Sequence, residues 1–251
     1  MLAAERRRAI TNLMRKQSSV RVEDLCTRFG ASASTIRRDL EYLERRGTLK
    51  RTYGGAIAAD GDEVSLAVED TALSEVRSRI GAATAALIRE GETVFLGPGP
   101  TTLAVAQHLV TRSSVTVVTN ALNVATYLTA HSHLPVIVTG GQVDRPQTAL
   151  LGHLAQLTLR ELRADRAIIG VGGIHVPDGV TGESLPGVQF LRSVIELMPE
   201  LVIVADSGRW GRVGPAFLAA LEAIDVIVTD LNAPAAMVWD LAQLGIQVIQ
   251  T

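Results

Sequence analysis

The sequence predicts an α/β protein in two parts: a small helical module ending in a β-hairpin, then a larger domain built on a mostly parallel sheet. Apolar residues recur at helical spacing through the first 45 positions. Beyond residue 72, short apolar runs alternate with helical segments. Continuous apolar strands between helices are typical of a parallel sheet that is covered on both faces.

The amino-terminal module contains three predicted helices, over residues 3–16, over residues 22–29 and between Ser32 and Gly47. Their expected inward residues are Ile10, Leu13, Met14, Val22, Leu25, Cys26, Phe29, Ile36, Leu40 and Leu43. Ser32 is a favourable N-cap for the third helix, and Gly47 is a favourable stop beyond it. A Gly-Gly pair within residues 48–57 predicts a hairpin. Helices and hairpin together predict a winged helix-turn-helix over residues 1–57.

Polar side chains cover the opposite face of the third helix. If the amino-terminal half of that helix enters a major groove, its side chains reach base edges and phosphates. The hairpin would carry basic residues and a tyrosine to the DNA backbone or the minor groove. The candidate DNA-binding residues are therefore Ser32, Ser34, Thr35, Arg37, Arg38, Lys50, Arg51 and Tyr53.

The charge is unevenly distributed between the two parts. Residues 1–57 hold 13 Lys and Arg against 6 Asp and Glu, whereas the remaining chain holds 11 against 20. The formal net charge of −2 for the whole chain conceals this difference. A small basic module gains affinity for DNA by releasing counterions from phosphates. The alternative is a solvated basic module without a partner.

Composition excludes several classes. No apolar run reaches the roughly 18–20 residues that span a bilayer, and the charged amino-terminal helix lacks the apolar segment of a signal peptide. The single cysteine, Cys26, excludes an intramolecular disulfide and a cysteine metal cluster. The pair His131 and His133 is better explained as a solvated helix end than as a metal site. We expect a cytoplasmic protein with no membrane partner, no metal and no cofactor.

Residues 58–71 are small and acidic and predict a linker, and residues 72–251 predict the larger domain. The expected strands are residues 93–96, 115–119, 135–139, 166–170, 201–205, 225–229 and 246–249. The expected helices are residues 75–89, 101–110, 121–130 and 153–162.

Ligands of such sheets bind outside the carboxyl ends of the strands. Five loops are expected at that edge: residues 97–102, 119–120, 140–141, 170–173 and 206–209. Glycines allow close approach of a ligand, and a helix that opens at Thr101 and Thr102 suits an anion. The candidate ligand residues are Gly97, Gly99, Thr101, Thr102, Asn120, Gly141, Arg145, Gly172, Gly173, Asp206 and Arg209. For Asp206 the alternative is capping of the turn that follows it, and for Arg145 it is a surface role.

The first 57 residues closely resemble the DNA-binding domain of DeoR-family transcriptional regulators. The match runs through Val20, Glu23, Leu25, Phe29, Ser32, Thr35-Ile-Arg-Arg-Asp-Leu40, Leu43, Gly47 and Arg51-Thr-Tyr-Gly-Gly-Ala56. The rest resembles the family's sensor domain through Phe95-Leu-Gly-Pro-Gly99, Val117-Val-Thr-Asn120, Thr139-Gly-Gly141, Leu151-Gly152, Arg163-Ala-Asp165, Ala205-Asp-Ser207 and Gly211-Arg212. That domain is similar to ribose-phosphate isomerases. The resemblance implies a repressor of sugar-use genes whose sensor binds a phosphorylated sugar.

The chain departs from the family pattern at several positions. The family commonly has aspartate at Gly97, threonine at Pro100 and an acid within residues 170–173. Acids and a lysine often follow Thr181, but residues 58–251 contain no lysine. Either the effector is atypical or the pocket has lost ligand binding.

Two other classes of protein remain open. An isomerase fused to a DNA-binding module would need a base beside a carbonyl, for which Glu183 and Asp206 are the candidate carboxylates. The lack of lysine excludes Schiff-base chemistry in this domain. We expect the domain to contain no catalytic residues. The other class is a DNA-binding protein with a ligand-free dimerisation body. One module contacts only a few base pairs of DNA. Affinity for a double-stranded DNA operator therefore requires two or more modules, and we expect a homodimer or homotetramer.

Overall fold

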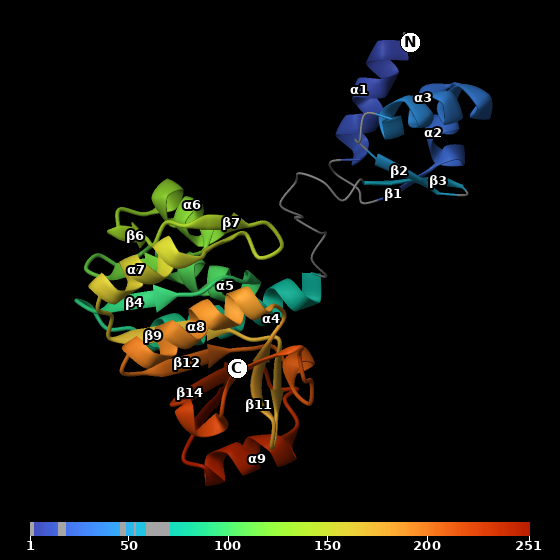
Figure 1. Cartoon of the computed structure of the whole chain (residues 1–251). Coiled ribbons are helices and arrows are strands. Elements are labelled where there is room, and N and C mark those ends of the chain that lie inside the picture. Colours follow the sequence, from blue (N-terminus) through green and yellow to red (C-terminus); the bar gives the residue numbers. More distant parts are fainter. Residues whose placement is uncertain (1–2, 15–18, 46–48, 53, 59–70) are drawn as a thin grey trace. The chain divides into compact units, whose positions relative to one another are not determined.

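The computed structural model describes residues 3–14, 19–45, 49–52, 54–58 and 71–251 (Figure 1). It separates into two compact units, Met1–Thr71 and Ala72–Thr251. No helix in the described ranges is long and apolar enough to cross a membrane.

In the first unit, helices α1 (Ala3–Met14), α2 (Val22–Phe29) and α3 (Ala33–Arg45) share one core. The inward-facing residues at its centre are Ile10, Leu25, Ile36, Leu40 and Leu43. Gly30 ends α2 in the left-handed conformation at φ 59°, which glycine adopts without steric cost. These residues and Val22 confirm the predicted helical faces, with Leu13, Cys26 and Phe29 partly buried against the same core. The side chain of Met14, also expected to face inward, lies outside what the structure describes.

The hairpin is formed by β2 (Leu49–Thr52) and β3 (Gly55–Ala58), paired antiparallel as predicted. A third strand that the sequence did not reveal, β1 (Ser19–Arg21), pairs with β3, so the sheet order is β1-β3-β2. A Cβ atom at position 55 would lie 1.9 Å from the carbonyl oxygen of Val20. Gly55 is therefore needed for the approach of β1.

The predicted linker of residues 58–71 differs from the structure at both ends, because Ala58 belongs to β3 and Thr71 begins α4 (Thr71–Leu87). Residues 59–70 lie outside the described residues, as do Gly47 and Tyr53. Their predicted roles as linker, helix stop and DNA contact stay predictions.

The second unit contains a seven-stranded parallel sheet of order β15-β14-β12-β9-β4-β5-β6. Every neighbouring pair in it is parallel, which confirms the predicted sheet. Its strands are β4 (Thr93–Leu96), β5 (Thr116–Thr119), β6 (Val136–Val138), β9 (Arg166–Gly170), β12 (Leu201–Val204), β14 (Val226–Thr229) and β15 (Gln247–Gln250).

Helices cover both faces of this sheet (Figure 1). Alternate residues of β4 enter different cores: Val94 and Leu96 pack with α4, α5 (Pro100–Leu109) and α6 (Leu122–His131). Phe95 packs into the opposite core, to which α7 (His153–Glu161), α8 (Leu185–Leu197) and α9 (Ala235–Gln243) contribute. Because both faces are covered, an inner strand such as β12 is apolar and buried along its whole length, whereas the edge strand β15 begins and ends with exposed glutamine.

Several short elements were not predicted. The antiparallel hairpin of β7 (Gln142–Asp144) and β8 (Ala149–Leu151) follows β6. A three-stranded antiparallel sheet is formed by β10 (Gly173–His175), β11 (Gly179–Gly182) and β13 (Ala216–Ala219). Helices α8 and α9 and the 3-10 turns η1 (Ser207–Arg209) and η2 (Leu221–Ala223) were also unassigned.

Candidate DNA-binding and effector-binding sites

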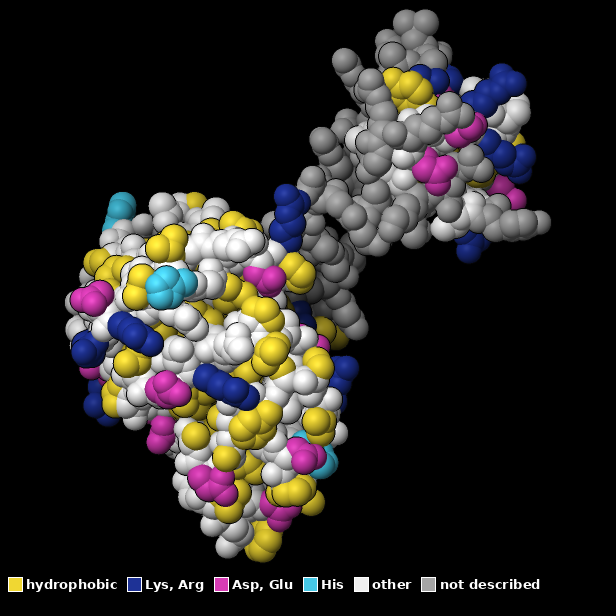
Figure 2. Space-filling model, viewed as in Figure 1, with side chains coloured by type: hydrophobic (Ala, Val, Ile, Leu, Met, Phe, Trp, Pro, Cys, Tyr) yellow, Lys and Arg dark blue, Asp and Glu magenta, His cyan; other side chains and the backbone are white. Residues whose placement is uncertain are grey.

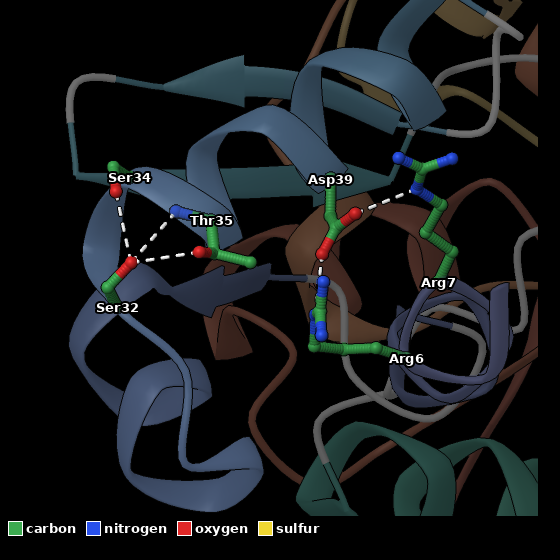
Figure 3. Close-up of polar contacts among 6 residues, drawn as sticks. All are labelled: Arg6, Arg7, Ser32, Ser34, Thr35 and Asp39. Atoms are coloured by element: carbon green, nitrogen blue, oxygen red, sulfur yellow. Dashed lines mark hydrogen bonds and ion pairs between the residues drawn. The ribbon is translucent and has the colours of Figure 1, made fainter. Parts of the chain in front are cut away.

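The hydroxyl of Ser32 caps the amino terminus of α3. Its Oγ accepts a hydrogen bond from the backbone N–H of Thr35 at 3.3 Å, which confirms the predicted N-cap. The same Oγ lies 3.0 Å from Ser34 Oγ and 2.9 Å from Thr35 Oγ1 (Figure 3). The three candidate hydroxyls therefore form one cluster at the end of the helix that was expected to enter DNA.

Arg37 and Arg38 lie on the exposed side of α3, opposite the buried Ile36 and Leu40. Neither arginine makes a hydrogen bond or ion pair within the described part of the chain. Their guanidinium groups thus keep all their donors for an external acceptor.

The hairpin candidates are only partly placed. Lys50 and Arg51 belong to β2, but the structure does not describe their side chains, and Tyr53 lies outside the described residues. The expected hairpin contacts with DNA stay a prediction.

A buried ion cluster that sequence reasoning missed holds α3 against α1. Asp39 accepts a hydrogen bond from Arg6 Nε at 2.6 Å and another from Arg7 Nε at 2.7 Å (Figure 3). The carboxylate is nearly inaccessible, with 2% of its side chain exposed. The sequence did contain a signal for this cluster. Asp39 stands directly before Leu40, which was expected to face inward, and a charged side chain is almost never buried without an ionic partner.

At the carboxyl edge of the parallel sheet, the loop from β4 to α5 is tightly built. Gly97 donates its N–H to the carbonyl of Ile168 at 2.9 Å, and a Cβ there would lie 3.1 Å from Ile169 Cγ2. Gly99 has φ 131°, which favours glycine, and its carbonyl accepts from Thr102 Oγ1 at 2.9 Å. Thr101 and Thr102 are buried in the first turn of α5.

Asn120 follows β5 and is completely buried. Its side-chain Nδ2 donates to the main-chain carbonyl of Leu150 at 3.1 Å, and the main-chain carbonyl of Asn120 accepts from the N–H of Leu150 at 2.7 Å. The side-chain Oδ1 has no hydrogen-bond partner among the described residues. Asn120 therefore anchors β8 and retains one acceptor.

Gly141 and Arg145 are associated with the β7–β8 hairpin. Gly141 has φ 119°, and a Cβ there would lie 2.5 Å from the carbonyl oxygen of Leu151, so backbone packing alone requires glycine. Arg145 is exposed in the turn between the two strands.

Gly172 and Gly173, which follow β9, lie in close contact with the backbone of neighbouring segments. The N–H of Gly172 donates to the carbonyl of Thr181 at 2.7 Å, and a Cβ on Gly173 would lie 2.2 Å from the carbonyl oxygen of Arg212. They are needed for packing of β10 and β11, a requirement that the sequence pattern did not distinguish from ligand approach.

Arg209 forms an ion pair with Glu183 over this loop. Its Nη1 lies 3.1 Å from Glu183 Oε1 and 3.5 Å from the carbonyl oxygen of Gly172. The candidate cation and one candidate carboxylate are thus brought together.

Asp206 is buried at the end of β12 and combines two roles. Its Oδ1 accepts from the N–H of Gly208 at 3.1 Å, which is the turn-capping alternative. Its Oδ2 lies 3.8 Å from Nε of Arg77 on α4, a residue that sequence reasoning missed. A buried carboxylate and a guanidinium thus lie together at the carboxyl edge.

Asp230, another missed residue, fixes the Asp206 loop from the end of β14. It accepts hydrogen bonds from the N–H of Ser207 and, at 3.2 Å, from the N–H of Asn232. Burial acts to raise the pKa of Asp230, but the hydrogen bonds from Ser207 and Asn232 outweigh it and hold the pKa below 3.8. Nearby, Trp210 Nε1 donates to Thr229 Oγ1 at 3.1 Å, so the buried Trp210 packs beside the loop.

Comparison with protein families matches both units. Residues 6–61 match the DeoR-like helix-turn-helix domain, and residues 73–231 match the DeoR C terminal sensor domain. The chain belongs to the DeoR family. The family resemblance of the sequence is confirmed over both units.

This DeoR-family protein is similar to curated regulators over nearly its whole length. It is 30% identical to the HTH-type transcriptional regulator GlpR of Haloferax volcanii, covering 99% of this chain and 98% of that protein. It is 29% identical to the glycerol-3-phosphate regulon repressor of Escherichia coli K12, covering 98% of each. It is 30% identical to the transcriptional repressor AccR of Agrobacterium fabrum, covering 90% and 89%.

These relatives are transcriptional regulators, and the chain is accordingly a DNA-binding regulator with a sensor domain rather than an enzyme. Among solved structures, ribose 5-phosphate isomerase A from Neisseria gonorrhoeae is similar at 14% identity with a TM-score of 0.42, covering 56% of this chain and 54% of that one.

Proposed function

We propose that this DeoR-family regulator represses transcription by binding a duplex operator through the amino-terminal half of α3. A phosphorylated sugar, or a similar small anion, binds the carboxyl edge of its parallel sheet and changes operator affinity. The observation that carries the DNA-binding proposal is the division of α3 into two faces. Ile36 and Leu40 are buried, whereas Arg37 and Arg38 are exposed without an intramolecular partner in the described residues.

The chemistry of the exposed face suits DNA. An arginine in the major groove can donate two hydrogen bonds to O6 and N7 of guanine, and hydroxyls donate to bases or phosphates. Ser34, Thr35, Arg37 and Arg38 supply these groups within the first turns of α3. Ser32 holds the helix start, and Lys50, Arg51 and Tyr53 of the hairpin are proposed to assist at the backbone.

The effector proposal is supported by the charges at the carboxyl edge. Arg77 and Arg209 offer cationic groups there, and Asp206 offers a carboxylate that can accept from sugar hydroxyls. The first turn of α5 adds a helix amino terminus, which favours an anion. Gly97, Gly99, Thr101, Thr102, Asn120, Gly172 and Gly173 surround this edge, and Gly141 and Arg145 remain outlying candidates.

Repression further requires assembly. One module contacts too few base pairs for specific binding, so we propose that a homodimer or homotetramer presents two or more modules to the operator. An effector that binds one arrangement of the modules more tightly than the other favours that arrangement. It thereby changes the affinity of the protein for the operator. Residues 1–57 bind DNA and residues 72–251 bind effector and assemble, in the cytoplasm.

The DNA-binding proposal is tested by selecting duplexes from a random pool with the full-length protein and then titrating the selected duplex in gel shifts. Arg37→Ala is expected to cost about 1–3 kcal/mol of binding free energy if the side chain contacts guanine. Arg160→Ala, an exposed arginine on α7, is the charge-matched control. Unchanged affinity for both Arg37→Ala and Arg38→Ala refutes this placement.

The effector proposal is tested by thermal unfolding of the full-length protein with sugar phosphates, glycerol 3-phosphate and inorganic phosphate. A bound ligand raises the melting temperature with concentration, and Asp206→Ala should abolish the rise produced by a sugar phosphate. If no compound stabilises the wild type and none alters gel shifts, the second unit is a ligand-free dimerisation body.

A further inference from the structure

The guanidinium of Arg7 on α1 is held from two sides. Its Nε donates to Oδ1 of the buried Asp39 at 2.7 Å. Its Cζ lies 3.9 Å from the centre of the Tyr42 ring, the distance of a cation–π contact. Both partners belong to α3, so the position of Arg7 is tied to the helix that carries the proposed DNA contacts.

Arg7 is the more accessible of the two guanidinium groups in this cluster. Asp39 is a single carboxylate between two guanidinium groups, because Arg6 also donates to it at 2.6 Å. The Arg6 side chain is 11% exposed, whereas that of Arg7 is 29% exposed. The guanidinium of Arg7 is therefore the one that solvent reaches more readily. Figure 3 shows the two terminal nitrogens of Arg7 pointing away from Asp39.

The position of Tyr42 places this charge beside the exposed face of α3. Tyr42 lies four residues after Arg38 and seven after Thr35, so the three side chains follow one stripe of the helix. The Tyr42 ring is itself exposed. Arg7, stacked on that ring, lies at the carboxyl end of the stripe whose amino end carries the proposed base contacts.

We propose that Arg7 binds a backbone phosphate of the DNA that α3 enters. This inference rests on the proposed DNA-binding function and adds a contact from α1. Nε is used by Asp39, which leaves Nη1 and Nη2 for two parallel hydrogen bonds to phosphate oxygens. Because Asp39 and Tyr42 already fix the side chain, little conformational entropy is lost on binding.

A phosphate contact has a measurable signature that does not depend on DNA sequence. Each phosphate that is neutralised contributes about −0.9 to the slope of log K against log salt concentration. With the full-length protein and a duplex of random sequence, Arg7→Ala should reduce the magnitude of that slope by about 0.9. Affinity at about 0.1 M salt should fall roughly 8-fold, and equally on random and selected duplexes.

Two further variants separate charge from structure. Arg7→Lys keeps the charge and should retain the wild-type slope, whereas Arg7→Gln keeps a donor for Asp39 and should behave as Arg7→Ala. Arg160→Ala in the other unit should leave the slope unchanged. Thermal unfolding followed by circular dichroism establishes that each variant is folded at the titration temperature.

The possible outcomes are distinct. Wild-type slopes in folded Arg7→Ala and Arg7→Gln overturn the inference and leave the proposed function intact. A loss confined to the selected duplex, with the random duplex unaffected, also overturns it, because it indicates base contact or distortion of α3. If the wild type binds no duplex at any salt concentration, the proposed function fails and the inference with it.

Discussion

Oδ2 of Asp206 lies 3.8 Å from Nε of Arg77, which joins the end of β12 to helix α4. Both side chains are largely buried, so each charge depends on its neighbours rather than on water. The same carboxylate caps η1 through the N–H of Gly208. One side chain thus stabilises the turn that carries Arg209 and supports the first helix of the unit.

We expect Asp206→Ala to destabilise the second unit by about 1–3 kcal/mol, because it leaves buried donors without their acceptor. The two tryptophans of the chain, Trp210 and Trp239, both belong to this unit. Tryptophan fluorescence in urea therefore measures the effect specifically. Asp240→Ala, at an exposed position on α9, is the matched control, and an unfolding midpoint for Asp206→Ala equal to the control's contradicts the assignment.

Asp39 has the corresponding role in the first unit. Replacement by alanine leaves Arg6 and Arg7 facing each other without the carboxylate between them, and loss of one partner of a buried pair costs about 3–5 kcal/mol. Circular dichroism should show a separate, earlier transition in Asp39→Ala, while the tryptophan fluorescence transition stays in place.

The control for this prediction is Asp24→Ala on the exposed first turn of α2, which should cost less than about 1 kcal/mol. Coincident circular dichroism and fluorescence transitions in Asp39→Ala, both at wild-type positions, rule out the proposed importance of the cluster.

The cap on α3 gives a smaller effect that conservative replacement should repair. Ser32→Ala removes the acceptor for the N–H of Thr35, and such losses cost about 0.5–2 kcal/mol. Ser32→Asn offers an equivalent acceptor and should restore most of the stability in the circular dichroism transition. Equal stability of Ser32→Ala and wild type would show that the bond contributes nothing.

The sequence predicted the elements whose periodicity is unambiguous. The helical spacing of Ile36, Leu40 and Leu43 defined α3, and continuous apolar runs such as residues 201–204 defined the parallel strands. These patterns are local, and each is enforced by burial of a whole face.

The missed elements have patterns that tertiary contacts override. The sequence analysis assigned no helix to residues 185–197, which form α8 and include Gly187. A Cβ at position 187 would lie 2.9 Å from Gln147 Oε1 and 3.0 Å from Ser184 Oγ. This glycine therefore lies in close contact with neighbouring side chains inside a helix and does not mark a turn. The strands β1 and β10 are three residues long, and each is defined by its partner rather than by its own composition.

The residues of the candidate sites were also predicted only in part. Residue type and position at strand ends placed Asp206 and Arg209 at one edge, whereas Arg77 and Asp39 are defined by ion pairs with distant segments. Long-range ion pairs leave no periodic trace in a single sequence. The glycines at 141 and 173 matched a ligand loop equally well, and only the backbone beside them shows a packing requirement.

The lowered pKa of Asp230 predicts a pH dependence of the second unit. A carboxyl group whose folded pKa lies below its unfolded value binds fewer protons in the native state, so its ionised form stabilises the fold. This stabilisation is fully present above the unfolded value of about 3.8 and is lost as pH falls through the lower folded pKa. Asp230→Asn cannot ionise and lacks it at every pH.

Urea unfolding followed by tryptophan fluorescence should therefore show a wild type that is more stable than Asp230→Asn from neutral pH down to about pH 5. Below about 3.8 the difference should shrink, because protonation removes the charge that Ser207 and Asn232 stabilise. Other carboxyl groups titrate in both proteins and cancel in the difference. A difference that grows on acidification has the opposite sign and would show that Asp230 is destabilised by its surroundings, which would also remove it as the group that holds the Asp206 loop in place.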